Sequence, residues 1–195
     1  DPNCAFLSEA GKSRTYQCDV SMLHHDADGI DWTVTVSIED QTGVLATDSA
    51  TFTVNPLNDI SITPAQIDFP TVAPEQTDIL PTGSQTTSVR NRGNYEGIIQ
   101  VISSDLIGET NPTENIPAAN FLVTGSSEAV SVCTTGTPLV SGSAEIITSS
   151  SLPRGPDDGS SNIEELSYCL TLIPDISSQF YSSTVAGGNA WTIQI

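Results

Sequence analysis

The residues best suited to chemistry lie in one loop, His24-His-Asp-Ala-Asp-Gly-Ile-Asp31. Three carboxylates, Asp26, Asp28 and Asp31, surround Gly29 at an expected tight turn. Hard cations such as Ca²⁺ prefer clustered oxygen ligands of this kind. The loop therefore predicts a calcium site, with a solvated acidic hairpin loop as the alternative. It is not an EF-hand, because the later Glu and the flanking helices are missing.

A second, weaker cation site is predicted at Asn58 and Asp59, which follow a strand-like run and Pro56. This stretch resembles the acidic, calcium-stiffened linkers of cadherins. Only the Asn and the Asp match that pattern, and the fuller acidic set of those linkers is not present. The resemblance implies a cation between two modules, and an ordinary polar linker is the alternative.

No set of side chains with catalytic spacing is found. The two histidines are adjacent in one loop, and no Gly-x-Ser-x-Gly elbow or glycine-rich phosphate loop occurs. Glu164 and Glu165 suggest the paired carboxylates of a glycosidase, but adjacent residues on a strand point to opposite faces. The sequence therefore predicts no catalytic residues and a protein that is not an enzyme.

The four cysteines fall into two pairs, Cys4 with Cys18 and Cys133 with Cys169. Four cysteines allow three connectivities, and proximity in the sequence favours these two bridges. The second bridge is expected between two strands on an outer surface, since both of its cysteines are out of phase with the apolar residues around them. Disulfides form in oxidising compartments, and the chain starts at Asp1 without Met, as one trimmed of a signal peptide would. An extracellular or cell-surface location is predicted.

The charge of the 195-residue chain is lopsided, with 24 acidic residues against one Lys and four Arg, for a formal charge of −19. Such a surplus repels nucleic acids and anionic lipids, so neither is an expected partner. Solubility is the simplest explanation of the acidity, and calcium binding or life in high salt are the alternatives. No apolar segment approaches the roughly 20 residues that span a bilayer, so no membrane span is expected.

The pattern of elements is all-β, because apolar and polar residues alternate in short runs between Gly, Pro, Asn and Asp. The stretch 50–62 divides the chain into a small module, residues 1–56, and a larger one, residues 57–195, with a short hinge at 55–59. In the first module the alternation predicts strands at 4–8, 15–23, 32–39 and 46–54. In the second it predicts strands at 60–63, 67–72, 85–91, 97–104, 120–124, 129–134, 143–148, 165–173 and 190–195.

Two motifs resemble known families of secreted proteins. The runs Tyr16-x-Cys18-x-Val20-x-Met22, Trp32-Thr-Val-Thr-Val-Ser-Ile-Glu-Asp40 and Ala50-Thr-Phe-Thr-Val54 resemble the Ig-like and PKD-like repeats of archaeal and bacterial surface proteins. The run from Val89 to Val101, in which Gly93 and Asn94 tolerate positive φ and are expected to close a turn between strands, resembles CARDB-type Ig-like domains. These resemblances imply two Ig-like β-sandwich modules and a role in structure or adhesion rather than catalysis.

The first module is short for this architecture, because Ig-like sandwiches use about seven strands over roughly 100 residues. Its apolar face needs cover, and three sources are open: the second module, residues upstream, or a strand from a neighbouring subunit. The last source predicts a filament or lattice. The stripe Trp191, Ile193 and Ile195 is the candidate subunit interface, with the last strand of its own sandwich as the alternative.

The function predicted from these features is a structural subunit of an extracellular filament or surface layer. Its copies would assemble by β-strand donation or edge pairing, so the expected partner is the chain itself. The alternative is an adhesin or carbohydrate-binding module of a larger surface protein, with glycans as partners. No cofactor is expected other than calcium.

Overall fold

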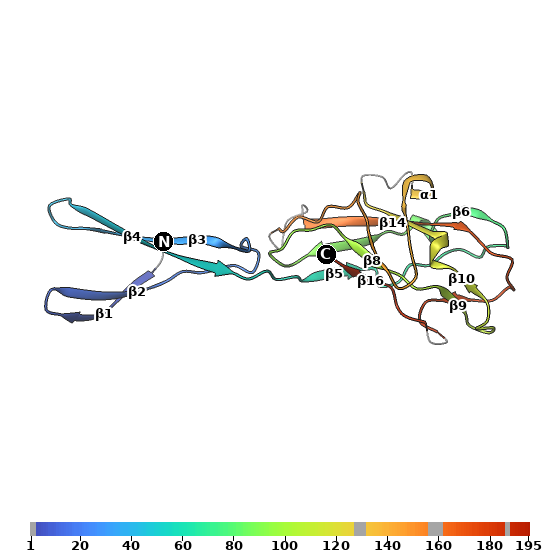
Figure 1. The fold of residues 1–195 in the computed structure, drawn as a ribbon, viewed down its shortest axis with the longest axis horizontal. Helices are drawn as coiled ribbons and strands as arrows, with labels where there is room; N and C mark the ends of the chain where they lie inside the picture. The colour runs from blue at the N-terminus through green and yellow to red at the C-terminus, as the bar shows by residue number, and fades with distance from the viewer. Residues whose placement is uncertain (1–2, 127–131, 156–161, 186–187) are drawn as a thin grey trace.

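The computed structural model describes residues 3–126, 132–155, 162–185 and 188–195, and over these residues the chain is predominantly β-strand. The prediction of an all-β protein is therefore confirmed at the level of fold class. Figure 1 shows an elongated arrangement in which two hairpins extend from a larger body that holds the remaining strands.

The first 54 residues form two antiparallel hairpins that belong to separate two-stranded sheets. The first hairpin joins β1 (Asn3–Ala10) to β2 (Ser13–Asp19), and the second joins β3 (Gly29–Glu39) to β4 (Leu45–Val54). Asp40 closes the turn of the second hairpin, because its Oδ1 accepts the N–H groups of Thr42 at 2.8 Å and Val44 at 2.9 Å. The alternating apolar residues on both strands then fix the register, which sets Trp32 opposite Phe52.

The body begins at β5 and contains two main sheets and one small one. The order is β12-β11-β14-β7-β5 in the first, with β6 also paired to β14, then β13-β8-β16 in the second and β10-β9-β15 in the third. The strands of the first sheet are β5 (Ile60–Thr63), β6 (Thr77–Ile79), β7 (Thr87–Asn91), β11 (Phe121–Thr124), β12 (Thr137–Pro138) and β14 (Ile163–Leu172). The others are β8 (Gln100–Ile102), β9 (Leu106–Gly108), β10 (Asn115–Ile116), β13 (Ala144–Ile146), β15 (Tyr181–Ser182) and β16 (Thr192–Gln194).

One hydrophobic core holds the body together, and side chains from both main sheets contribute to it. Phe121 at its centre meets Phe69 and Trp191 edge-on, with ring centroids 5.6 Å and 5.2 Å away. Every fully buried apolar residue of the described chain lies at Val89 or beyond, so the hairpins contribute none. Packing of the first module on the second is therefore not how the hairpins are covered.

Two of the predicted strands are wrong. Residues 67–72 form no strand, although Ile67, Phe69 and Val72 pack against the core as expected. Pro70 within this segment has no N–H donor for a sheet ladder, and Pro74 follows it closely. In the predicted strand at 129–134, residues 129–131 lie outside the described residues and Val132–Thr135 form the short helix α1.

Both predicted disulfides are formed, but the second does not lie where it was expected. Cys169 sits on β14 with no exposed surface, and its partner Cys133 belongs to α1 rather than to a strand. The expectation assumed a strand with one face in solvent. Since β14 lies between β11 and β7 and is buried on both faces from Leu166 to Leu170, its alternation marks no outer surface.

Candidate interaction surface

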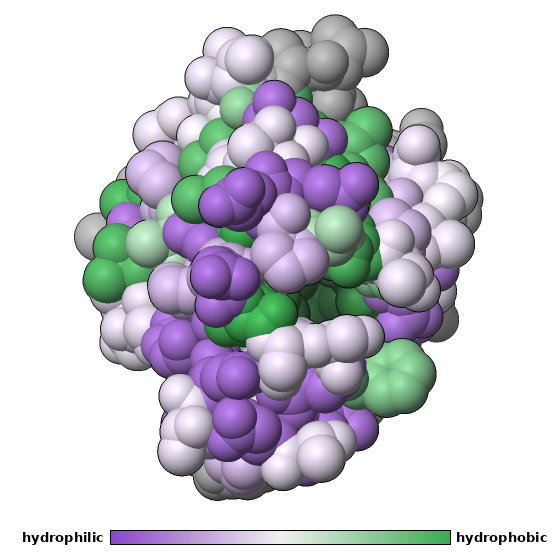
Figure 2. All heavy atoms as spheres, turned by 90° about the vertical axis from the view of Figure 1, so that its right-hand side faces the viewer, coloured by the Kyte–Doolittle hydropathy of each residue, from purple (hydrophilic) through white to green (hydrophobic). Residues whose placement is uncertain are grey.

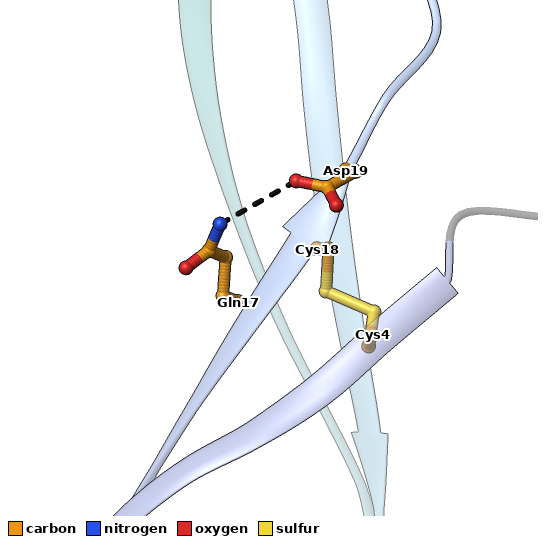
Figure 3. Close-up of a disulfide and its surroundings, with 4 residues drawn as sticks. All are labelled: Cys4, Gln17, Cys18 and Asp19. Atoms are coloured by element: carbon orange, nitrogen blue, oxygen red, sulfur yellow. Dashed lines mark hydrogen bonds between the residues drawn. A yellow bond between two sulfur atoms is a disulfide. The ribbon is translucent and has the colours of Figure 1, made fainter.

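The first hairpin presents an apolar face to solvent. Phe6 and Tyr16 lie opposite each other in the ladder and meet edge-on at a centroid distance of 5.8 Å, yet both are more than half exposed. Two residues further along the strands the same pairing brings Cys4 opposite Cys18, which closes the disulfide shown in Figure 3. The bridge fixes the register of the hairpin but covers little of its apolar surface.

The second hairpin is covered at its base and open toward its tip. Trp32 and Val34 are half-buried, and the indole N–H of Trp32 donates to the carbonyl of Ala27 at 2.7 Å. Further along the same face, Val36 is 48% exposed and Ile38 is 64% exposed. The apolar face of this hairpin, which the sequence predicted to need cover, is therefore open to solvent toward its tip.

These open faces are energetically unusual. A two-stranded hairpin alone is at best marginally stable in water, and independent stability needs more strands or a packing partner. Burial of one Val, Ile or Phe side chain contributes about 1.5–3 kcal/mol. Cover over even a few of the exposed side chains would therefore change the stability of residues 3–54 decisively. We define the apolar faces of both hairpins together as the hairpin surface.

The tips of the two hairpins carry opposite charge. Lys12 and Arg14, two of the five basic residues of the chain, lie at the tip of the first hairpin, where Arg14 pairs with Glu9 at 3.3 Å. Glu39 and Asp40 lie at the tip of the second. The Thr42 hydroxyl, followed by backbone N–H groups of the turn, lowers the pKa of Asp40, so this carboxylate stays charged to unusually low pH.

Residues 55–59, which connect the hairpins to the body and were predicted to be a hinge, are held to the body by hydrogen bonds. Asn94 accepts the N–H of Leu57 at 2.6 Å and donates to the carbonyl of Asn55 at 3.1 Å. The Asn94 N–H also reaches the Leu57 carbonyl at 3.2 Å, and the Arg92 N–H reaches the carbonyl of Asp59 at 2.7 Å. We call this set of bonds the linker clamp.

Gly93 is required in the linker clamp for a different reason from the predicted one. Gly93 and Asn94 were predicted at a turn because both tolerate positive φ, but neither adopts it. A Cβ on Gly93 would instead lie 1.8 Å from the carbonyl oxygen of Leu57. The glycine is needed because two backbone segments touch, and no local motif signals a contact with a residue so distant in the sequence.

The two main sheets leave neighbouring edges open near the linker. β5 ends one sheet and β16 ends the other. A shallow hollow of about 250 Å³ lies between them, lined by Asn58, Ile60, Ile193, Gln194 and Ile195. Asn58, predicted as a weak cation ligand with Asp59, therefore faces this hollow. A strand that paired with either edge would place side chains over the isoleucines.

The predicted interface stripe lies within its own sandwich. β16 pairs with β8, and Trp191, Ile193 and Ile195 pack against the core of the body. The indole N–H of Trp191 also donates to the carbonyl of Ser104 at 2.8 Å. The strand therefore belongs to its own body, which was the alternative to a subunit interface, and its apolar stripe is not free for donation in this conformation.

The acidic loop does not bring its carboxylates together over the described side chains. Asp26 closes the turn, since its Oδ2 accepts the N–H of Leu23 at 2.8 Å and its own N–H donates to the Leu23 carbonyl at 3.0 Å. Asp28 is exposed, and the side chain of Asp31 lies outside the described residues. Calcium binding by this loop stays a prediction.

One potential ligand group occurs elsewhere in the part of the chain that the structure describes. A carboxylate oxygen of Asp78 and the sulfurs of Cys133 and Cys169 all lie within 4.8 Å of one another. Both sulfurs are consumed by their disulfide, and a thiolate rather than a disulfide sulfur is the ligand that metals require. This cluster is therefore not a metal centre.

A polar network that sequence reasoning missed surrounds Glu114 at the end of the body opposite the hairpins. Its Oε2 accepts bonds from the hydroxyl of Ser177 at 2.5 Å, the Ser177 N–H at 3.0 Å, the Gln179 amide at 2.9 Å and the Tyr181 hydroxyl at 2.9 Å. These donors, led by the Ser177 hydroxyl, lower the pKa of Glu114 to about 2, and desolvation raises that of Tyr181. Figure 2 shows that polar side chains cover much of this end.

Neither pair of residues considered for catalysis forms a catalytic arrangement. Glu164 is buried and accepts the N–H and hydroxyl of Ser126 at 2.7 Å and 3.0 Å, whereas Glu165 accepts the Thr86 hydroxyl at 2.8 Å. The rings of His24 and His25 meet edge-on with centroids 5.0 Å apart.

Comparison with protein-family models, with curated proteins and with solved structures gave no match. The resemblance to Ig-like repeats therefore rests on the motifs alone. Within the described residues no helix is both long and apolar enough to cross a bilayer.

Proposed function

We propose that this chain is a structural subunit of an extracellular filament or surface layer, in which copies cover one another's hairpin surface by strand donation or edge pairing. The observation that carries the proposal is the exposure of apolar side chains along both hairpins. Each hairpin supplies a small sheet with a hydrophobic face and too few strands to cover it. In this proposal each hairpin pair is part of an Ig-like sandwich that a neighbour completes.

Three other features support assembly between copies. Both main sheets of the body end in open edges at β5 and β16, and these edges border the same hollow. The basic tip of the first hairpin and the acidic tip of the second are complementary, so neighbouring copies can pair tip to tip. The two disulfides suit an oxidising, extracellular location.

The test combines sedimentation with electron microscopy of the purified chain and two matched variants. Val36→Lys places a positive charge on the hairpin surface. The new ammonium lies opposite Asp48, and a cross-strand pair of opposite charges contributes about 0.2–1 kcal/mol to the stability of a hairpin, so the hairpin itself should persist. Val140→Lys makes the same change on the body at a residue of similar exposure, 52%. Wild type and Val140→Lys should form assemblies, and Val36→Lys should stay monomeric.

The design separates lost apolar contact from altered charge. Both variants reduce the net negative charge equally, so a change in repulsion between copies affects both. A wild-type chain that remains a monodisperse monomer at high concentration overturns the proposal. Equal assembly of all three proteins would show that the copies do not associate through the hairpin surface.

A second candidate function is recognition of a glycan as an adhesin module. Phe180 is 80% exposed beside Tyr181, and exposed aromatic rings provide stacking surfaces for sugars. Binding of the monomer to a glycan array, lost in Phe180→Ala, would support this function. Absence of binding in wild type would remove it.

A further inference from the structure

The two disulfides differ in access to solvent. Cys4 and Cys18 are both exposed, in a hairpin that the rest of the described chain leaves open. Cys169 has no exposed surface, and Cys133 is half-buried on α1. Thiol–disulfide exchange begins when a thiolate reaches one sulfur, so access controls its rate. The first bridge is open to this attack, and the second requires local opening of the body.

The charges next to the two bridges also favour reaction at Cys4–Cys18 over Cys133–Cys169. A carboxylate oxygen of Asp78 lies within 4.8 Å of both sulfurs of the buried bridge, where it repels an approaching thiolate anion. At the exposed bridge the adjacent acid is Asp19. As Figure 3 shows, its carboxylate turns toward Gln17, which donates to it at 3.5 Å. Residues that alternate along a strand face opposite sides, so Gln17 and Asp19 share the face away from Cys18.

We infer that Cys4–Cys18 is a site of reversible modification by an external thiolate, and that Cys133–Cys169 is a structural bridge protected by burial and by Asp78. The thiolate attacks the sulfur of Cys4 or Cys18, a mixed disulfide forms, and the Cys4–Cys18 bond breaks. The released cysteine leaves as a thiolate and takes a proton from water. A second external thiolate then attacks the external sulfur of the mixed disulfide and releases the remaining protein cysteine as a thiolate, so that the protein is reduced and two external thiols are oxidised to their disulfide.

The test is a time course of the native full chain with reduced glutathione, an anionic thiol, at a dilution where sedimentation shows a monomer, since assembly through the hairpin surface would itself cover Cys4–Cys18. Samples are quenched with iodoacetamide, and alkylation of each cysteine is measured by peptide mass spectrometry. Cys4 and Cys18 should become labelled faster than Cys133 and Cys169 by on the order of tenfold or more. The second bridge is the internal control. Equal rates, a faster reaction at Cys133–Cys169, or no reaction at either bridge would overturn the inference.

A pair of variants tests the role of Asp78. Asp78→Asn removes the charge and tolerates the left-handed backbone at this position, where φ is 55°. The rate of reaction with glutathione should then rise several-fold at Cys133–Cys169 and stay the same at Cys4–Cys18. Glu75→Gln, an exposed residue of the same segment with φ of 63°, is the matched control and should leave both rates unaltered.

The cationic thiol cysteamine provides the complementary measurement. Its attacking thiolate carries an ammonium group and no net charge, so Asp78 repels it much less than the glutathione thiolate, and Asp78→Asn should accelerate its reaction at Cys133–Cys169 little. If Asp78→Asn fails to accelerate the glutathione reaction, or accelerates both thiols equally, electrostatic protection by Asp78 is contradicted.

Discussion

At the scale of single residues, Gly93 allows the linker and the body to come into contact because it has no side chain. Because a Cβ there would lie 1.8 Å from the Leu57 oxygen and 3.0 Å from the Asp59 nitrogen, Gly93→Ala must push the linker away. Overpacking of this kind costs about 1–3 kcal/mol, so the free energy of unfolding of the body should fall by that amount. Denaturant titration measures it.

Gly97→Ala is the control for this prediction, since the atom nearest to its new Cβ is 3.4 Å away. Hydrogen exchange at the Leu57 amide should rise in Gly93→Ala and not in Gly97→Ala, because only the former breaks the linker clamp. An unchanged Leu57 amide in Gly93→Ala would show that the clamp does not depend on this glycine.

Glu114 predicts a pH dependence at the same scale. Its folded pKa of about 2 lies below the ordinary 4.5, so the carboxylate contributes stability that is fully present above pH 4.5. The contribution is lost as the pH falls from 4.5 toward 2. The melting temperature of Glu114→Gln should therefore lie below that of wild type at neutral pH and converge with it near pH 2. Glu109→Gln, an exposed neighbour, should show no such convergence.

At the scale of elements, local patterns predicted what local interactions decide. The hairpin of β3 and β4 followed from alternation and from the turn at Asp40, and its register is set by those residues. The strands β6, β9, β10, β12 and β15 were missed because two or three residues carry no period. The open hairpin surface was expected from the small number of strands. The linker clamp was not, since Asn94 is 37 residues from Leu57.

The last strand offers a prediction about this element's role. Trp191 contacts Phe121 and bonds to Ser104, so Trp191→Ala removes a partly buried side chain that packs against the core and should destabilise the body by about 2–3 kcal/mol, less than for a fully buried Trp. Phe180→Ala, at an aromatic residue that is mostly exposed, is the control and should change stability little. Thermal and denaturant unfolding of monomeric protein measure both. A Trp191→Ala monomer of wild-type stability that no longer assembles would instead favour donation of this strand.

At the scale of the whole molecule, apolar attraction and charge repulsion oppose each other in any contact between copies. Each chain carries a formal charge of −19, and its hairpins expose the apolar side chains that assembly would bury. The repulsion is screened by salt, while apolar burial persists or strengthens. The architecture therefore suits a saline exterior, where the repulsion weakens and the hairpin surface decides association.

Sodium chloride should accordingly promote assembly. Between 0.1 M and 1 M salt the screening length falls from about 10 Å to about 3 Å, so the sedimentation coefficient of wild type should rise over this range. Val36→Lys should respond less than Val140→Lys, because it removes apolar contact while both variants change the charge equally. Dissociation at high salt would contradict this mechanism and indicate that charge pairing at the hairpin tips holds the copies together. Lys12→Gln would then weaken assembly at low salt, since it removes one of the few basic side chains available for such a pair.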